Sequence, residues 1–186
     1  MTMVIVSLLA LLTLLTGWSI MTYGLTLLAL CWMIFGGGLV ALAVIDARTK
    51  LLPDALTLPL MWLGIAMQLF PETRTIGLSA SIWGVIAGYV PLWVLAHLYR
   101  FLRGRDGLGF GDLKLLAAMG AWSGALILPS VVFLASLLAL VGVLLTRLMR
   151  KTSADSSDWQ AEFPFGPWII AAYMICLVTG FALTAV

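Results

Sequence analysis

Long apolar runs separated by short polar breaks make up most of the chain, and seven of them are candidates to cross a bilayer as helices. A transmembrane helix needs about 20 predominantly apolar residues, although somewhat shorter spans occur. The predicted spans are 3–20, 25–45, 56–71, 79–99, 113–128, 130–147 and 167–185. Pro129 divides the fifth run from the sixth, because proline favours a reversal between apolar segments. The pattern predicts an all-α, polytopic membrane helix bundle that forms one domain over 1–186.

Two segments could be read in another way. The run 3–20 resembles a signal peptide in its position, but it has no basic segment before it and no convincing small-residue cleavage site. We therefore expect it to be a span. The longest polar stretch, 150–163, is predicted to be a linker, since it is too short to fold alone.

The composition excludes an ordinary soluble domain. Of the 186 residues, 63% are hydrophobic and only 10% are charged, and the mean hydropathy is +1.14. A soluble domain carries about 25% charged residues. The low charge content therefore indicates an integral membrane protein.

The basic residues predict the orientation of the spans. If the seven spans alternate in direction, nine of the ten Lys and Arg residues fall on one side, and only Arg74 falls on the other. Short loops rich in Lys and Arg stay in the cytoplasm. The N-terminus is therefore expected inside the cell and the C-terminus outside it.

Metal and nucleophile chemistry have few candidate residues. The chain has two cysteines, Cys31 and Cys176, each inside an apolar run, and one histidine, His97. A zinc site needs several closely spaced Cys or His ligands. We expect no metal site and no cofactor. Ser/His/Asp or Cys/His catalysis would have to use the single histidine, which sits near the end of a span.

Two aspartates at span ends are the strongest candidates for catalysis. Asp46 closes the second predicted span and Asp112 opens the fifth, so the alternating topology places both at the same membrane depth. Carboxylates at such a depth are costly and are often functional. Two neighbouring carboxylates cannot both ionise easily, so one keeps a proton. Such a pair is suited to general acid–base attack of water on a peptide bond.

Structural roles for these carboxylates remain open at this point. Asp112 could cap the helix that follows it, and Asp54, which comes before the third span, could do the same. Asp46 could pair with Arg48 or Lys50. If Asp46 and Asp112 form a pair, the helix dipoles predict that Asp112, at an N-terminus, is the anion. Asp46, at a C-terminus, would then hold the resting proton.

The residues beside Asp112 indicate close backbone approach. Gly109 and Gly111 remove side-chain bulk next to the carboxylate, which would let another helix or a substrate strand come near. We expect the substrate to approach around Gly109, Gly111 and Lys114. The glycines from 104 to 111 do not have the G-x-G-x-x-G spacing of a nucleotide-binding loop.

Three sequence blocks resemble type IV prepilin peptidases. They are IDARTKLLPDALTLPLMWLG (45–64), GFGDLKLLAAMGAW (109–122) and PFGPW (164–168). The second contains the G-x-G-D motif of intramembrane aspartyl proteases. The motif alone is weak evidence, but two long blocks in the right order, with Asp46 and Asp112 66 residues apart, are specific. The resemblance extends from about 30 to 170.

The resemblance implies an enzyme that removes the leader from type IV prepilins or type II secretion pseudopilins. It implies a bacterial inner-membrane location with the active site near the cytoplasmic face. The family's catalytic aspartates map onto Asp46 and Asp112, whereas Asp54 matches an acidic position usually regarded as non-catalytic. The partners would be the prepilin substrate, the lipid bilayer and possible contacts with the assembly machinery, with no nucleic acid.

Three other functions compete with this one. Many family members also methylate the new N-terminus and carry a cytoplasmic domain with two C-x-x-C pairs. That domain does not occur in this sequence, so the chain resembles a short form and methylation is doubtful. A proton-coupled transporter would need ionisable residues at mid-span, and we find none. A non-catalytic subunit of a secretion machine would explain the helices but not the paired blocks.

Overall fold

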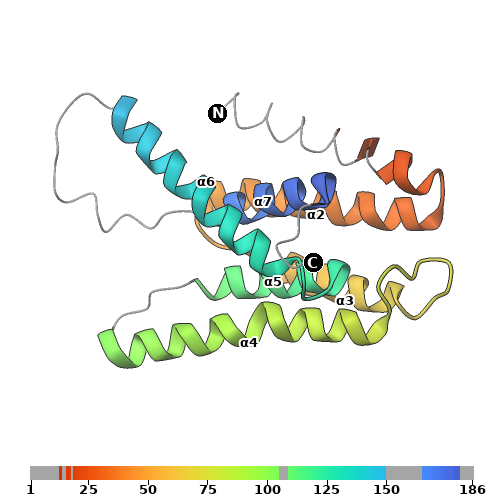
Figure 1. Ribbon diagram of the computed structural model, residues 1–186, viewed down its shortest axis with the longest axis horizontal. Coiled ribbons are helices and arrows are strands. Elements are labelled where there is room, and N and C mark those ends of the chain that lie inside the picture. Colours follow the sequence, from red (N-terminus) through yellow and green to blue (C-terminus); the bar gives the residue numbers. More distant parts are fainter. Residues whose placement is uncertain (1–12, 14–15, 18, 105–108, 150–164, 181–186) are drawn as a thin grey trace.

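The fold is a bundle of α-helices, seen in a computed structural model (Figure 1). The structure describes residues 13, 16, 17, 19–104, 109–149 and 165–180, and this part of the chain contains no strand. The prediction of an all-α bundle is confirmed. The helices are α2 (Leu27–Thr49), α3 (Asp54–Met67), α4 (Leu78–Arg103), α5 (Phe110–Ser123), α6 (Leu128–Met149) and α7 (Gly166–Thr179). Most of the first predicted span and the whole of the predicted linker lie outside the described residues.

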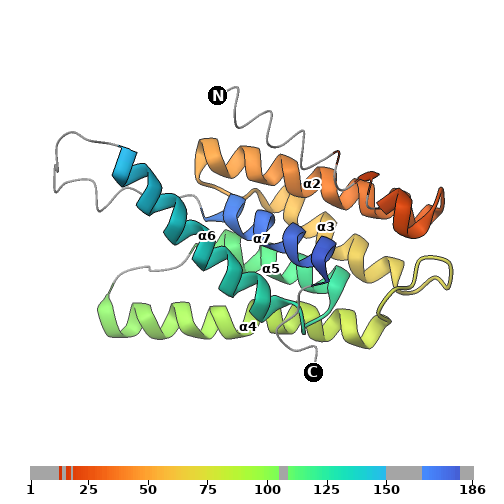
Figure 2. The ribbon, with the colours of Figure 1, turned by 45° about the horizontal axis from the view of Figure 1, so that its top comes forward.

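Successive helices run in opposite directions, as the alternating spans predict. At one end of the bundle α2, α4 and α6 finish and α3, α5 and α7 begin; this end is at the left of Figures 1 and 2. We call it the carboxylate end, because it carries Asp46 in the last turns of α2 and Asp112 in the first turn of α5. The shared depth predicted for these two aspartates follows from this alternation.

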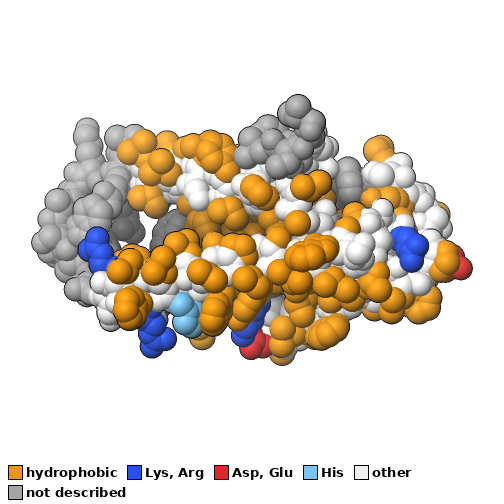
Figure 3. Space-filling model, turned by 60° about the horizontal axis from the view of Figure 1, so that its bottom comes forward, with side chains coloured by type: hydrophobic (Ala, Val, Ile, Leu, Met, Phe, Trp, Pro, Cys, Tyr) orange, Lys and Arg blue, Asp and Glu red, His pale blue; other side chains and the backbone are white. Residues whose placement is uncertain are grey.

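Three of the described helices are long and apolar enough to cross a membrane. They are Leu27–Thr49, Leu78–Arg103 and Leu128–Leu145, while α3 and α7 are shorter apolar helices. Large hydrophobic side chains, including Trp83 and Trp93, are exposed along α4, and hydrophobic atoms cover most of the face drawn in Figure 3. A soluble monomer rarely exposes so large an apolar surface, whereas a lipid-facing helix requires it. The chain is a multi-pass membrane protein.

The reversal between the fifth and sixth helices was predicted at the wrong residue. α5 ends at Ser123 and α6 begins at Leu128, so Pro129 is the second residue of α6. Proline is tolerated in the first helical turn, where its missing N–H has no partner to lose. The chain instead turns from Gly124, whose φ of +80° lies in a region that favours glycine.

α5 lies at the centre of the bundle and contacts α3, α4, α6 and α7. Its side chains are buried from Leu113 to Trp122, with the exception of Lys114, which is partly exposed. A helix with apolar side chains on every face is stable only when other elements surround it. The helix that carries Asp112 is therefore held on several sides.

Small residues allow α4 and α5 to lie in close contact. A Cβ atom added at Gly84 would lie 2.0 Å from the carbonyl oxygen of Gly120, and one added at Gly88 would lie 2.5 Å from that of Leu116. Ser81 Oγ also donates a hydrogen bond of 2.7 Å to the carbonyl of Ala121. This interface uses glycines spaced four apart, the arrangement that lets membrane helices approach backbone to backbone.

An aromatic cluster fixes α5 against α2 and α3. The rings of Phe35 and Trp122 are stacked with centroids 4.2 Å apart, and Trp122 Nε1 donates a hydrogen bond of 2.9 Å to the carbonyl of Leu60. Leu60 lies in the middle of α3, just after Pro59. The hydrogen bond satisfies the indole N–H, which would otherwise be costly to bury.

Candidate active site

Asp46 is buried at the carboxylate end of the bundle. It lies one turn before the end of α2, its side chain is only 5% exposed, and it is the only acidic side chain that is buried among the described residues. Its Oδ2 accepts a hydrogen bond of 3.0 Å from the backbone N–H of Gly166, the first residue of α7. The predicted alternative, a pair with Arg48 or Lys50, is not formed. The Asp46 carboxylate turns instead to the start of another helix.

Asp112 is half-buried in the first turn of α5. The residue that caps this helix is Gly109, and no side chain makes a capping hydrogen bond there. Asp112 therefore does not act as the N-cap, which was the structural alternative for this residue. In the part of the chain that the structure describes, we find no hydrogen bond to its carboxylate. Its first-turn position places it at the positive end of the α5 dipole.

The fold brings the two carboxylates together across 66 residues of sequence. α2 and α5 both pack against α7, so Asp46 and Asp112 lie near enough for their charges to interact. Like charges at close range cannot both be carried easily, so such a pair favours the state in which one of the two groups is protonated. The arrangement can supply a base and an acid at the same place.

The two predicted glycines have different steric roles. A Cβ atom at Gly109 would lie 3.2 Å from Asp112 Oδ2, so a side chain there would crowd the carboxylate. A Cβ atom at Gly111 would lie 2.9 Å from the side chain of Leu52, in the connection between α2 and α3. Gly111 thus lets this connection approach α5, and Gly109 keeps space open beside Asp112.

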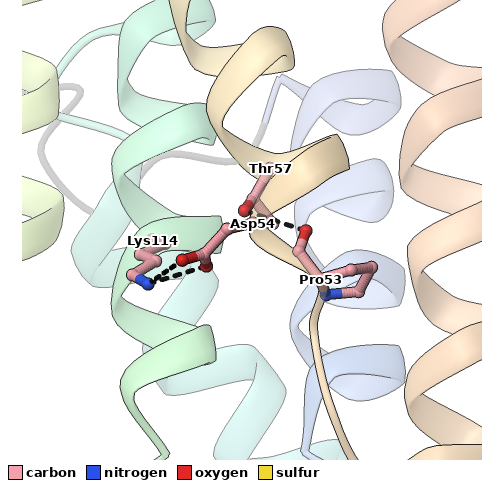
Figure 4. Close-up of polar contacts among 4 residues, drawn as sticks. All are labelled: Pro53, Asp54, Thr57 and Lys114. Carbon is pink, nitrogen blue, oxygen red and sulfur yellow. Dashed lines mark hydrogen bonds and ion pairs between the residues drawn. The ribbon is translucent and has the colours of Figure 1, made fainter.

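Asp54 and Lys114 pair with one another. Lys114 Nζ lies 2.7 Å from both carboxylate oxygens of Asp54, joining the starts of α3 and α5 (Figure 4). Asp54 is 55% exposed and Lys114 is 29% exposed, so the pair contributes about 0–1 kcal/mol to stability. Pro53, and not Asp54, is the N-cap of α3, so the capping role considered for Asp54 is wrong. Asp54 is thus paired and largely exposed, whereas Asp46 is buried.

Gly166 is a site residue that the sequence reasoning did not single out. The segment PFGPW was noted only as part of the family resemblance. Its Gly-Pro pair immediately before an apolar run is a signal for a helix start. The Gly-Pro pair could therefore have predicted an N–H at Gly166 with no partner inside the helix. It could not have predicted that this N–H binds Asp46 of α2.

The described residues contain no group of three or more His, Cys, Asp and Glu side chains that could hold a metal ion. Both cysteines, Cys31 and Cys176, are free thiols. Asp46 and Asp112 are the candidate catalytic groups, and the fold places them at the same end of the bundle.

Comparison with known proteins agrees with these features. Residues 33–144, which include both aspartates, match the model of the type IV leader peptidase family. A protein of Dickeya chrysanthemi named prepilin leader peptidase/N-methyltransferase is 44% identical over 157 residues, which is 83% of this chain and 52% of that protein. Proteins of the same name from Stutzerimonas stutzeri and Pseudomonas aeruginosa are 37% and 39% identical over 172 residues.

The match covers most of this chain but little more than half of each relative. It covers 92% of this chain and 57% of the Stutzerimonas stutzeri and Pseudomonas aeruginosa proteins, so the chain spans about half the length of the curated relatives it matches. No solved structure shows a significant match. On the family match, which includes Asp46 and Asp112, the chain belongs to the type IV leader peptidase family.

Proposed function

We propose that the chain is an aspartyl endopeptidase that removes the leader peptide from type IV prepilins or type II secretion pseudopilins. The observation that carries the proposal is the placement of Asp46 and Asp112 at the same end of the bundle, both within the segment that matches the leader peptidase family. Two interacting carboxylates suit the hydrolysis of a peptide bond, because one can act as the base while the other acts as the acid.

The reaction uses one water molecule and returns each carboxyl group to its starting state. The ionised carboxylate takes a proton from the water, and the oxygen of that water adds to the scissile carbonyl carbon. The neutral carboxylic acid gives its proton to the carbonyl oxygen, which forms a neutral gem-diol. The carbon–nitrogen bond then breaks, the leaving amine takes a proton from one aspartate, and a hydroxyl of the gem-diol returns a proton to the other.

The other functions have weaker support. The family match favours a peptidase over a proton-coupled transporter or a non-catalytic subunit. The curated relatives are also named as N-methyltransferases, but this chain matches only about half of their length. We therefore propose the peptidase reaction alone, in which Asp46 and Asp112 would supply the reacting groups.

The proposed location is the bacterial inner membrane, with the carboxylate end at the cytoplasmic face. Arg48, Arg100 and Arg103 lie near the ends of α2 and α4 at this end, as the positive-inside rule requires of a cytoplasmic side. The substrate would approach Asp112 beside Gly109 and Gly111, near Lys114. Contacts with the pilus or secretion assembly machinery are part of the same proposal.

Co-expression with a prepilin tests the proposal. The chain and a prepilin are produced together in cells without another prepilin peptidase, and loss of the leader is followed by mass spectrometry. Asparagine keeps the shape of aspartate but cannot cycle a proton. We expect both Asp46→Asn and Asp112→Asn to abolish cleavage, while the amount of protein in the membrane stays unchanged.

Two other acidic residues serve as matched controls. Glu72→Gln changes an exposed side chain in the loop at the opposite end of the bundle, and cleavage should be unaffected. Asp54→Asn removes a partly exposed ion pair, and substantial cleavage should remain. If Asp54→Asn is inactive and Asp46→Asn is active, the proposed pair is wrong and the acting residues are Asp54 and Asp112.

A further inference from the structure

The start of α7 meets the Asp46 carboxylate directly. The Gly166 N–H belongs to the first turn of α7, where N–H groups have no partner within the helix. It donates to Asp46 Oδ2 at 3.0 Å. The next residue, Pro167, has no N–H. Of the first two residues of α7, only Gly166 can therefore donate a backbone hydrogen bond. The positive end of the α7 dipole and this N–H act on Asp46 together.

Glycine is required at position 166 for reasons of space. A Cβ atom there would lie 2.7 Å from Asp46 Oδ2 and 3.1 Å from Asp46 Cγ. Real Cβ atoms do not come so close to another heavy atom. A larger residue at position 166 would therefore push the Asp46 carboxylate away from the N–H. The backbone of Gly166 is not in the left-handed region, so the constraint is the proximity of Asp46.

The ionised form of Asp112 is stabilised less than that of Asp46. Its carboxylate lies at the start of its own helix, α5, but accepts no hydrogen bond from the described residues. A hydrogen bond to an ionised group is stronger than the interaction of a charge with a helix dipole alone. Among the described helices packed against α2, α7 has no charged residue, and Asp54, the charged residue of α3, is paired with Lys114. The environment of the pair is therefore asymmetric.

We infer that Gly166 is a positioning residue that holds Asp46 as the anion, so that Asp112 keeps the proton at rest. This inference rests on the proposed peptidase function for its catalytic meaning. Asp46 is then the base that takes a proton from water, and Asp112 is the acid that protonates the scissile carbonyl oxygen. The dipoles of α2 and α5 alone predict the opposite, with Asp112 ionised and Asp46 protonated. The contact of Asp46 with the start of α7 reverses this assignment.

Infrared spectroscopy of single-aspartate variants tests this order. The full chain is purified as Asp112→Asn, as Asp46→Asn and as the double variant, and the carbonyl band of protonated carboxyl groups is followed against pH. Subtraction of the double-variant spectrum isolates the remaining aspartate. We expect Asp46 to lose its proton at a lower pH than Asp112. An equal midpoint, or a lower one for Asp112, overturns the assignment.

Gly166→Ala in the Asp112→Asn background tests the cause. Displacement of the carboxylate from the N–H should move the Asp46 midpoint to higher pH by about one unit or more. The matched control is Gly37→Ala, because a Cβ atom at Gly37 meets nothing within 4 Å. This control should leave the midpoint unchanged. An unshifted midpoint in Gly166→Ala would overturn the positioning role.

The spectra need no substrate, so this test is separate from the test of the proposed function. If the wild-type chain does not cleave prepilin, the peptidase function is contradicted, but the order in which the two aspartates ionise is unaffected. If Gly166→Ala does not fold, as judged by gel filtration, the comparison of the two single-aspartate variants still decides the order, because it changes nothing at Gly166.

Discussion

Gly84→Ala should weaken the contact between α4 and α5. A Cβ atom at Gly84 would lie 2.0 Å from the carbonyl oxygen of Gly120, where ordinary contact needs at least 3.4 Å, so the helices would have to separate by about 1.4 Å. The obstacle is backbone, which cannot rotate away as a side chain can. α4 is exposed on much of its surface, whereas α5 is surrounded, so we expect α4 to move and Asp112 to stay in place.

The expected loss of stability follows from three contributions. Overpacking a tight contact costs about 1–3 kcal/mol. Separation also weakens the hydrogen bond from Ser81 to Ala121, which is worth about 0.5–1.5 kcal/mol. Alanine offsets about 1 kcal/mol of this through its higher helix propensity. The free energy of unfolding should therefore fall by about 0.5–3.5 kcal/mol.

Reversible unfolding of the purified protein by sodium dodecyl sulfate in mixed micelles measures this change. Gly37→Ala is the control, since its Cβ atom meets open space and only the helix propensity changes. Gly84→Ala should unfold at a lower denaturant fraction than both the wild type and Gly37→Ala, while cleavage by the folded protein stays close to the wild-type level. A Gly84→Ala variant as stable as the control would show that this interface is not close-packed as described.

Two further predictions concern orientation and chemistry. Reporter fusions in the 72–77 loop should be periplasmic and fusions in 152–160 cytoplasmic, and the reverse pattern would contradict the proposed cytoplasmic position of Asp46 and Asp112. Chelators and reagents directed at serine or cysteine should leave prepilin cleavage unchanged, since the proposed reaction uses only two carboxyl groups and water. Inhibition by a chelator that added metal reverses would refute a carboxyl-only mechanism.

The sequence alone predicted the class of fold and the two candidate catalytic residues. Span lengths and the scarcity of charge required a membrane helix bundle, because a buried peptide group in lipid is satisfied only within a helix or a closed barrel. Alternation of the spans then placed Asp46 and Asp112 at the same end, without any knowledge of packing. The exact ends of the helices were less certain, as Pro129 illustrates, since proline suits both a reversal and a first helical turn.

Only the tertiary structure decided what each carboxylate contacts. Asp54 and Lys114 are both charged residues near helix starts, and nothing in their sequence positions indicates that they pair across 60 residues. Likewise, the sequence places Asp46 at the unfavourable end of its own helix, but the fold sets it against the favourable end of α7, at Gly166. Hydrophobic patterning determines which segments form helices and how deep they lie. Hydrogen bonds and charge interactions act over a few ångströms, so their partners are fixed only when the helices pack.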